Sequence, residues 1–171
     1  GIIAVQLKDD ELVNVIRTDG NQQIFIATKK GKAIRFHEKE LRPMGRNARG
    51  VRGISLARDD SVVGMCTVSE GSVLTVTELG YAKRTKFEEY PLKHRGGKGI
   101  VTMKVTRKNG AVAGMRAVKD ADEILIISQQ GKLIRIPTKG IRLMGRAAQG
   151  VIAMTIDESD MVSAATIVES D

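Results

Sequence analysis

A glycine-led apolar segment recurs four times along this chain at a nearly constant spacing. Its copies begin at Gly1, Gly50, Gly99 and Gly150, so that consecutive glycines stand 49, 49 and 51 residues apart. A fixed period of this size is typical of repeat proteins, in which one unit is too small to bury its own apolar face and must stack against its neighbours. We therefore expect a row of similar small units.

Two other positions keep this spacing and set the limits of the units. An arginine stands four residues before three of the glycines, at Arg46, Arg95 and Arg146. A second glycine is followed four residues later by another arginine, in the pairs Gly31 and Arg35, Gly80 and Arg84, and Gly131 and Arg135. These anchors divide a single domain, residues 1–171, into units 1–49, 50–98 and 99–149 and a partial unit 150–171.

Each unit contains short apolar stretches separated by turn residues. In the first unit these are 2–7, 12–17, 23–28 and 32–36, which are of strand length and rich in Ile and Val. Gly31 occupies a tight hairpin turn, where glycine adopts a positive φ at little cost. We expect four strands per unit, then a longer connection with short helical turns near 38–41 and 87–90.

Four-stranded units of about 40 to 50 residues are typical of bladed, propeller-like proteins. The chain has no tryptophan, which disfavours the WD40 type. A linear β-solenoid is a weaker alternative, because its coils are usually shorter. The expected fold is all-β and propeller-like, with four-stranded blades in about three complete repeats and a partial one.

The charge of the chain is uneven. Basic and acidic residues number 10 and 6 in the first unit, 8 and 6 in the second, 10 and 3 in the third, and none and 5 in residues 150–171. The basic body suggests a polyanionic partner, although a basic surface without a partner is the plainer interpretation. The single Cys66 fits a reducing cytoplasm and is expected to be a buried structural thiol. No apolar run is long enough to cross a membrane.

Basic residues at equivalent repeat positions should form a band around the rim of a bladed disc, matching a phosphate backbone that bends along it. The alternative is that each arginine hydrogen-bonds a neighbouring blade. The candidate contacts outside the glycine-rich loop are Lys32, Arg35, Arg42, Arg46, Arg49, Lys83, Arg84, Lys132, Arg135, Arg142 and Arg146. The aromatic residues do not form a stacking ladder for single strands and are expected to pack in the core or in turns.

The most unusual segment is the loop Lys93-His94-Arg95-Gly96-Gly97-Lys98-Gly99. Its three glycines and three bases allow both backbone N–H groups and side chains to reach phosphate. No Cys and His spacing suggests a metal, and no Walker motif suggests a nucleotide cofactor. We therefore expect no metal, no cofactor and no catalytic residue in this chain.

The segments Gly80-Tyr-Ala-Lys-Arg-Thr, Arg95-Gly-Gly-Lys-Gly99 and Arg42-Pro-Met-Gly-Arg-Asn-Ala-Arg-Gly50 closely resemble repeats of the C-terminal domain of DNA gyrase A. The resemblance covers essentially the whole chain. It implies a β-pinwheel, whose blades exchange strands with their neighbours. It also implies wrapping of double-stranded DNA around a basic rim, which supports ATP-dependent negative supercoiling by the parent topoisomerase. The implied partners are DNA, the rest of gyrase A and the gyrase B chains of the heterotetramer, at the nucleoid of the bacterial cytoplasm.

The chain departs from the hallmark box of that family, Gln-x-Arg-Gly-Gly-Lys-Gly, because Lys93 stands in place of the glutamine. This departure suggests a box-like loop of a later blade, in a C-terminal fragment that lacks the earlier blades. The acidic end resembles the start of the family's acidic tail. Two alternatives stay open: the equivalent C-terminal domain of topoisomerase IV, which the near-intact box disfavours, and a protein-interaction propeller with an acidic partner.

Overall fold

The computed structural model describes residues 1–5, 7 and 9–168. Within these residues the chain is all-β, with strands and three short 3-10 helices. The strands are β1 (Gln23–Thr28), β2 (Lys32–His37), β3 (Val62–Thr67), β4 (Ser72–Thr77), β5 (Tyr81–Lys86), β6 (Ile100–Val101), β7 (Val112–Val118), β8 (Glu123–Ser128), β9 (Leu133–Pro137), β10 (Val151–Ile152) and β11 (Val162–Val168). The helices are η1 (Glu38–Glu40), η2 (Phe87–Glu89) and η3 (Thr138–Gly140). None of these helices has the length or apolarity to cross a membrane.

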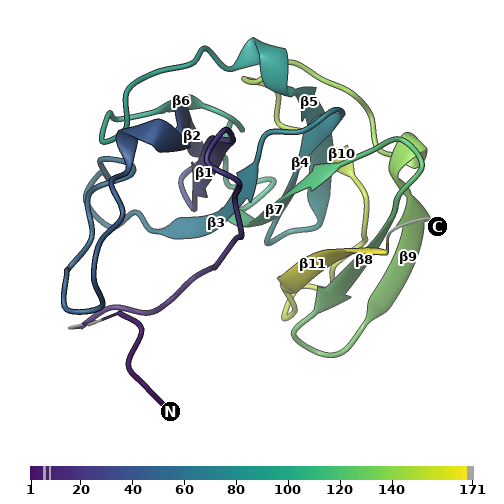
Figure 1. The fold of residues 1–171 in the computed structure, drawn as a ribbon. Coiled ribbons are helices and arrows are strands. Elements are labelled where there is room, and N and C mark those ends of the chain that lie inside the picture. Colours follow the sequence, from purple (N-terminus) through teal and green to yellow (C-terminus); the bar gives the residue numbers. More distant parts are fainter. Residues whose placement is uncertain (6, 8, 169–171) are drawn as a thin grey trace.

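The strands form three antiparallel sheets, each built on one hairpin. The orders are β3-β1-β2-β6, β10-β5-β4-β7 and β11-β8-β9. The sheets follow one another in chain order across Figure 1, and β7 packs against both β3 and β11. The expected helical turns near 38–41 and 87–90 are confirmed by η1 and η2.

Each sheet takes strands from more than one sequence unit. The hairpin β1–β2 receives β3 on one side and β6 on the other, with Lys32 opposite Val101 and Ala33 opposite Ile100. The hairpin β4–β5 receives β7 and β10 in the same way. A hairpin leaves unpaired backbone groups along both edges, and strands from later units satisfy them. This exchange confirms the β-pinwheel.

Two expected strands of the first unit do not form. Residues 12–17 contain no strand, nor do the described residues of 2–7, in which residue 6 lies outside the described part of the chain. Their counterparts in later units pair with hairpins of earlier units, as β3 pairs with β1 and β6 with β2. Within this chain no hairpin precedes residues 2–17. The expectation of four strands per unit was therefore wrong for the first unit, whereas residues 99–149 contain the four strands β6, β7, β8 and β9.

The hairpin glycines carry out two tasks. Gly31, Gly80 and Gly131 have φ of 75°, 76° and 86°, as expected for tight turns. At Gly80 an added Cβ would also lie 2.0 Å from the carbonyl oxygen of Met154, because the segment after β10 docks against this turn. Nothing lies within 4 Å of the corresponding point at Gly131.

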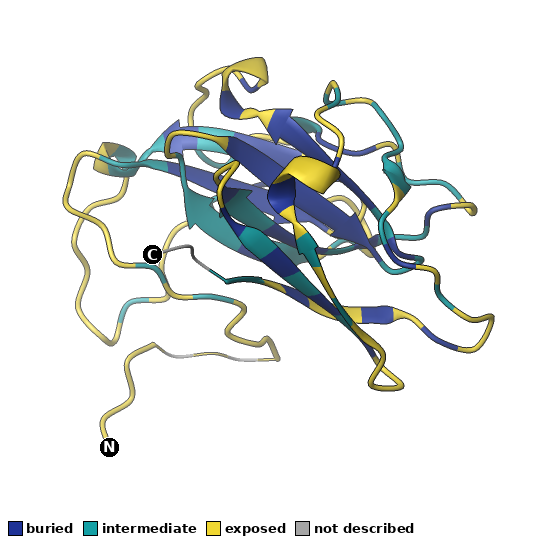
Figure 2. Cartoon of the chain, turned by 90° about the vertical axis from the view of Figure 1, so that its right-hand side faces the viewer, coloured by how far each residue is buried: buried dark blue, intermediate teal, exposed yellow. Residues whose placement is uncertain are grey.

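The core lies between and within the sheets (Figure 2). Phe25 of β1 meets the rings of Phe87 and Tyr90 edge-on, at centroid distances of 5.6 and 4.7 Å. Phe36 is also buried and Tyr81 is half-buried, so the expected packing role of the aromatic residues is confirmed. Burial raises the pKa of the Cys66 thiol to about 12, which suits a structural residue rather than a nucleophile.

Candidate nucleic-acid interface

Two loops leave a hairpin edge and return to it, so that each forms an arch over one strand. In the first arch (residues 93–100), the N–H of Lys93 donates to the carbonyl of Arg35 at 2.8 Å, and Ile100 pairs with Ala33. In the second arch (residues 144–151), the N–H of Met144 donates to the carbonyl of Arg84 at 2.8 Å, and Val151 pairs with Ala82. Both ends of each loop are thus fixed while its middle projects.

A carboxylate from the 3-10 helix one repeat earlier in the sequence steadies each arch. Glu40 of η1 accepts the N–H of Arg95 at 3.0 Å, and Glu89 of η2 accepts the N–H of Arg146 at 3.1 Å. The same Glu40 carboxylate lies 3.4 Å from the Nδ1 atom of His94. These glutamates lie 49 residues apart, so they share one repeat position. The third unit has glycine at that position, Gly140.

The arch arginines are half-buried and partly engaged. Arg95 donates from Nε to the carbonyl of Glu40 at 3.2 Å and from Nη1 to the carbonyl of Arg52 at 3.0 Å. Arg146 donates from Nη1 to the carbonyl of Val101 at 3.2 Å. A guanidinium has five N–H donors, so each arginine keeps others for a ligand.

The arginines of the hairpins serve the contact between blades. Arg35 is half-buried and donates from Nη1 to the carbonyls of Phe87 and Tyr90 at 2.7 and 3.2 Å. Arg84 is buried, donates to the carbonyl of Ile141 at 2.8 Å and pairs with Asp120. Their counterpart Arg135 is exposed and pairs with Glu123 on the adjacent strand.

Lys83 is wholly buried beneath the second arch. Its Nζ atom donates to the carbonyls of Gly145 and Arg146, both at 2.7 Å. Burial lowers the pKa of this ammonium to about 8. We therefore remove Lys83 and Arg84 from the expected interface, because both side chains are committed to interior contacts.

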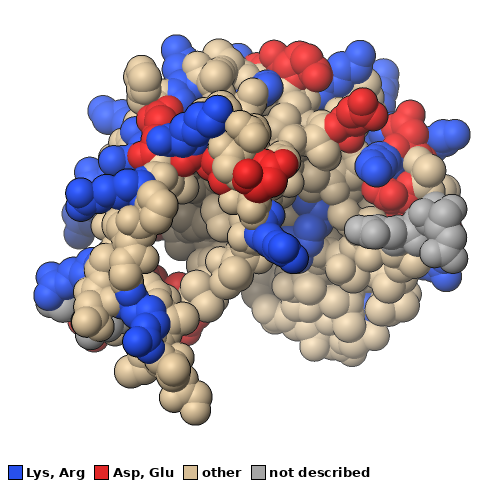
Figure 3. Space-filling model, viewed as in Figure 1, with Lys and Arg blue, Asp and Glu red and all other residues tan. Residues whose placement is uncertain are grey.

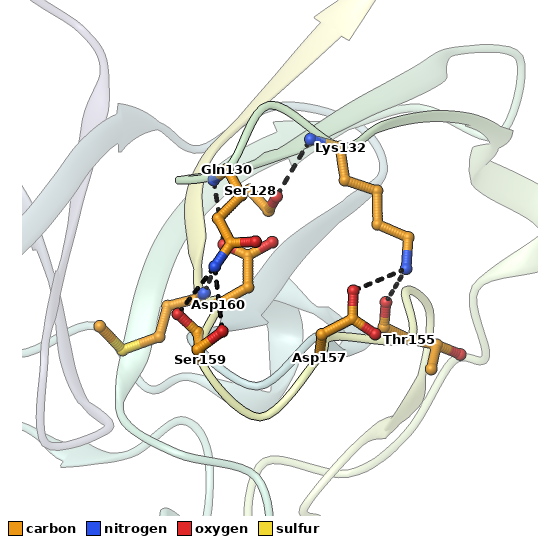
Figure 4. Close-up of polar contacts among 8 residues, drawn as sticks. Ser128, Gln130, Lys132, Thr155, Asp157, Ser159 and Asp160 are labelled. Atoms are coloured by element: carbon orange, nitrogen blue, oxygen red, sulfur yellow. Dashed lines mark hydrogen bonds and ion pairs between the residues drawn. The ribbon is translucent and has the colours of Figure 1, made fainter.

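Lys132 is exposed but tied to the partial fourth unit (Figure 4). Its Nζ atom donates to the carbonyl of Thr155 at 2.9 Å and lies 3.7 Å from the Asp157 carboxylate. The neighbouring N–H of Gln130 donates to buried Asp160 at 3.1 Å. Hydrogen bonds, led by that from Ser128, lower the pKa of Asp160. Lys32, the counterpart of Lys132, is exposed at the start of β2.

The remaining expected contacts are accessible on the arches and their flanks. The exposed residues are Arg42, Arg46, Arg49, Lys93, His94, Gly97, Lys98 and Arg142, whereas Gly96 and Gly99 are half-buried. Lysine and arginine side chains gather along the upper and left periphery of Figure 3, with acidic side chains between them, whereas its lower right is largely uncharged. Among the described residues no group of His, Cys, Asp and Glu is arranged to hold a metal ion.

The sequence patterns did not predict several lysine and arginine residues that lie beside the arches. The backbone of Lys104 bonds to Ala148 of the second arch at 3.2 Å, and the backbone of Gly53, next to Arg52, bonds to Gly96 of the first arch at 2.6 Å. The exposed bases in these flanking loops are Arg52, Arg58, Lys104, Arg107 and Lys108. The signal was present in the sequence, because residues 41–58 and 91–119 contain no Asp or Glu.

Comparisons with known proteins give a consistent result. A family model described as "DNA gyrase C-terminal domain, beta-propeller" matches residues 22–69, 71–119 and 122–169. The chain is 46% identical over 164 residues to DNA gyrase A of Salmonella typhimurium, a match that covers 95% of this chain and 19% of that protein. The chain spans about a fifth of the length of the curated relatives it matches.

Two solved structures share the fold. "Structure of DNA gyrase A C-terminal domain" superposes with a TM-score of 0.88 at 28% identity, covering 98% of this chain and 58% of that one. "Crystal structure of the C-terminal domain of DNA topoisomerase IV" superposes with a TM-score of 0.91 at 27% identity, covering 97% and 53%.

Proposed function

The chain belongs to the C-terminal domain family of DNA gyrase A, and from this premise we propose that it binds duplex DNA and bends it around its arches. The proposed contacts are backbone N–H groups and exposed lysine and arginine side chains. They bind the phosphates of DNA and do not read its nucleotide sequence. The chain would act as a non-catalytic module in the cytoplasm of a bacterium.

One observation carries this proposal: the two arches repeat the same geometry on consecutive blades. Each is fixed at both ends to a hairpin and held in the middle by a glutamate, so its bases project from a preorganised backbone. A ligand that meets both arches must present negative charge at a regular spacing. A nucleic-acid backbone does so, and following the arches from blade to blade requires it to bend.

The revised interface consists of the exposed or half-buried residues of the arches and their flanks. It comprises Arg42, Arg46, Arg49, Arg52, Lys93, His94, Arg95, Gly96, Gly97, Lys98, Gly99, Lys104, Arg107, Lys108, Arg142 and Arg146. Arg35, Arg135 and Lys132 are assigned a secondary role, because their side chains make contacts within or between blades. Lys32, which is exposed at the start of β2, stays a proposed contact.

In the whole protein, the bent duplex would be presented to the rest of gyrase A and to gyrase B. There it would support ATP-dependent negative supercoiling by the parent topoisomerase. These partners and this activity are part of the proposal, because the chain corresponds to only a fifth of its relatives' length.

The first test is the salt dependence of duplex binding. In a plot of the logarithm of affinity against the logarithm of salt concentration, each phosphate neutralised by a basic side chain makes the slope more negative by about 0.9. We also expect the affinity to be independent of the nucleotide sequence. Lys98→Met should make this slope shallower by about one and weaken different duplexes equally. An affinity that ignores salt would contradict the proposed phosphate contacts.

The second test separates bending from simple attraction. If the chain bends DNA, it should change the topology of a relaxed circle that is closed while the protein is bound, and should promote closure of short duplexes into rings. DNA binding without a change in topology and without ring closure would mean that a basic surface attracts DNA but does not bend it. A complex with an acidic protein that DNA competitor does not disturb would favour the protein-interaction alternative.

A further inference from the structure

A buried asparagine, Asn109, ties a basic loop to the second arch. The loop comprises residues 104–108 and follows β6. Its exposed basic side chains are Lys104, Arg107 and Lys108. The side chain of Asn109 is wholly buried, and its Nδ2 atom donates to the carbonyl of Lys104 at 2.9 Å and to that of Gln149 in the arch at 3.0 Å. One side chain thus holds the start of the loop and the end of the arch together.

The same side chain also closes the loop. Its Oδ1 atom accepts the backbone N–H of Thr106 at 2.7 Å and the Thr106 hydroxyl at 2.9 Å. An asparagine side chain offers two N–H donors and one oxygen with two lone pairs, so these four bonds use its full capacity. A backbone hydrogen bond of 3.2 Å from Lys104 to Ala148 adds to the attachment. The loop is therefore held in one conformation against the arch.

Asn109 differs from its counterparts in the other units. It stands at the repeat position of Asp60 and Asp160, 49 residues after the first and 51 before the second. Those two carboxylates accept backbone N–H groups of hairpin turns, from Lys30 at 2.9 Å and from Gln130 at 3.1 Å. A carboxylate has no N–H to donate, so an amide is needed at this position to bind the carbonyls of the loop and the arch.

We propose that Asn109 is a positioning residue for DNA: it fixes the basic loop beside the second arch, so that the basic side chains of both contact one stretch of duplex. This inference rests on the proposed function of the arches. Basic side chains on an unordered loop lose conformational freedom when they bind phosphate, and this loss weakens binding. A loop that is already ordered avoids that loss. Asn109 acts through the loop and, being buried, does not touch the DNA.

The first measurement needs no DNA. Trypsin cleaves after lysine and arginine, and both Arg107 and Lys108 lie in the loop. Asn109→Ala removes all four hydrogen bonds, so cleavage after these two residues should become about tenfold faster or more. Cleavage after Arg58, the counterpart of Arg107 in the preceding unit, should not change. Unchanged cleavage of the loop would overturn the proposal, as would an equal acceleration at Arg58, which would mean that the variant only loosens the whole fold.

The second measurement is the salt dependence of duplex binding. Asn109→Ala should weaken binding by roughly tenfold at low salt and make the slope shallower by about two, because the phosphate contacts of the loop are lost. The control is Gly131→Ala, which keeps the charge of the chain and strains a turn with a φ of 86° and nothing within 4 Å of the added Cβ. This control should leave the slope unchanged. An equal change in both variants would overturn the proposal, because loss of stability alone would then explain it.

A double-mutant cycle tests which contacts depend on Asn109. Lys108→Met should weaken binding less in the Asn109→Ala background than in the wild type, because the lysine is already displaced there. Lys98→Met, on the first arch, should weaken binding equally in both backgrounds. Additive effects of Lys108→Met and Asn109→Ala would contradict the positioning role. If wild-type binding ignores salt, the proposed function fails and the role in DNA binding with it, whereas trypsin cleavage still shows whether Asn109 holds the loop.

Hydrogen exchange of the wild type gives the answer if Asn109→Ala does not fold. The backbone N–H of Thr106 donates to the buried Asn109 side chain, so it should exchange as slowly as the paired amides of β7. Exchange of this N–H as fast as that of an open loop would overturn the proposal.

Discussion

Lys83 allows the energetic cost of a buried charge to be tested by the direction in which its contribution to stability changes with pH. Replacing it with methionine keeps the length of the side chain and removes the ammonium. In the structure this ammonium is buried and donates to the carbonyls of Gly145 and Arg146. Its pKa is about 8 instead of 10.5, chiefly because of burial; Glu89 raises the pKa and Arg146 lowers it further. The folded protein thus holds this proton less tightly than the unfolded chain does.

The sign and size of the effect follow from proton linkage. Between pH 8 and pH 10.5 the unfolded state binds more protons at Lys83 than the folded state, so the contribution of Lys83 to the free energy of unfolding rises with pH. The charged form is a cost that is fully present below pH 8 and is relieved as the pH approaches 10.5. Allowing for solvent screening near the loop, we expect a gain of about 2 kcal/mol.

The assay is urea unfolding of the wild type and Lys83→Met at several pH values across that range. Subtracting the two curves cancels the other titrating groups, and the wild type should gain stability relative to the variant as the pH rises. A relative loss would refute this reasoning, because it would mean that the two carbonyls raise the pKa above its ordinary value. Lys83→Met should also keep the salt slope of DNA binding, whereas Lys98→Met should make it shallower by about one.

Three other predictions test the arches and the hairpin turns. Glu40→Ala should impair DNA ring closure, whereas Glu40→Gln should not, because glutamine keeps an acceptor for the Arg95 N–H. If only the negative charge of Glu40 mattered, both variants would remove it and would tighten DNA binding equally. Gly80→Ala should lower the free energy of unfolding by about 3 kcal/mol or more, because its Cβ would lie 2.0 Å from a carbonyl oxygen. Gly131→Ala should lower it by about 1 kcal/mol, from its positive φ alone. Equal losses of the two variants in urea unfolding would contradict the close docking at Gly80. Because the pKa of Asp160 is lowered in the folded protein, its carboxylate should stabilise the fold above pH 3.8, and this stabilisation should be lost as the pH falls below that value. In thermal melting, the Asp160→Asn variant should not show this loss of stability. Parallel pH profiles of the wild type and the variant would show that the carboxylate does not hold the hairpin turn.

The hairpins could be predicted from the sequence because their signals are local. The apolar stretches 23–28 and 32–36 and the turn glycine Gly31 lie within fifteen residues, so period and turn chemistry suffice. The same reasoning failed at 12–17 and at the described residues of 2–7, which have equally good strand patterns. A strand also needs a partner edge, and for these segments the partner would be a hairpin of a preceding unit.

The candidate site was predicted only in part, for a related reason. Lys83 and Arg84 are adjacent on β5, and adjacent strand residues point to opposite faces. A sequence interpretation therefore expects at least one of them to face solvent. Both are buried, because the second arch covers one and the connection at Ile141 receives the other. The bases at Lys104 and Arg107 were missed because they lie outside the positions repeated in every unit.

The sequence by itself determined the repeat, the bladed all-β class, the hairpins and the basic character of the connections, whereas the β-pinwheel was implied by the family resemblance. These properties depend on spacing, turn residues and charge, which operate over a few residues or recur at a constant period. Only the tertiary structure decided which basic side chains remain exposed, which carboxylate holds each arch, and that Lys83 is buried beneath the second arch. Those outcomes depend on contacts between residues more than 50 positions apart, such as the hydrogen bond from the Lys83 ammonium to the carbonyl of Gly145.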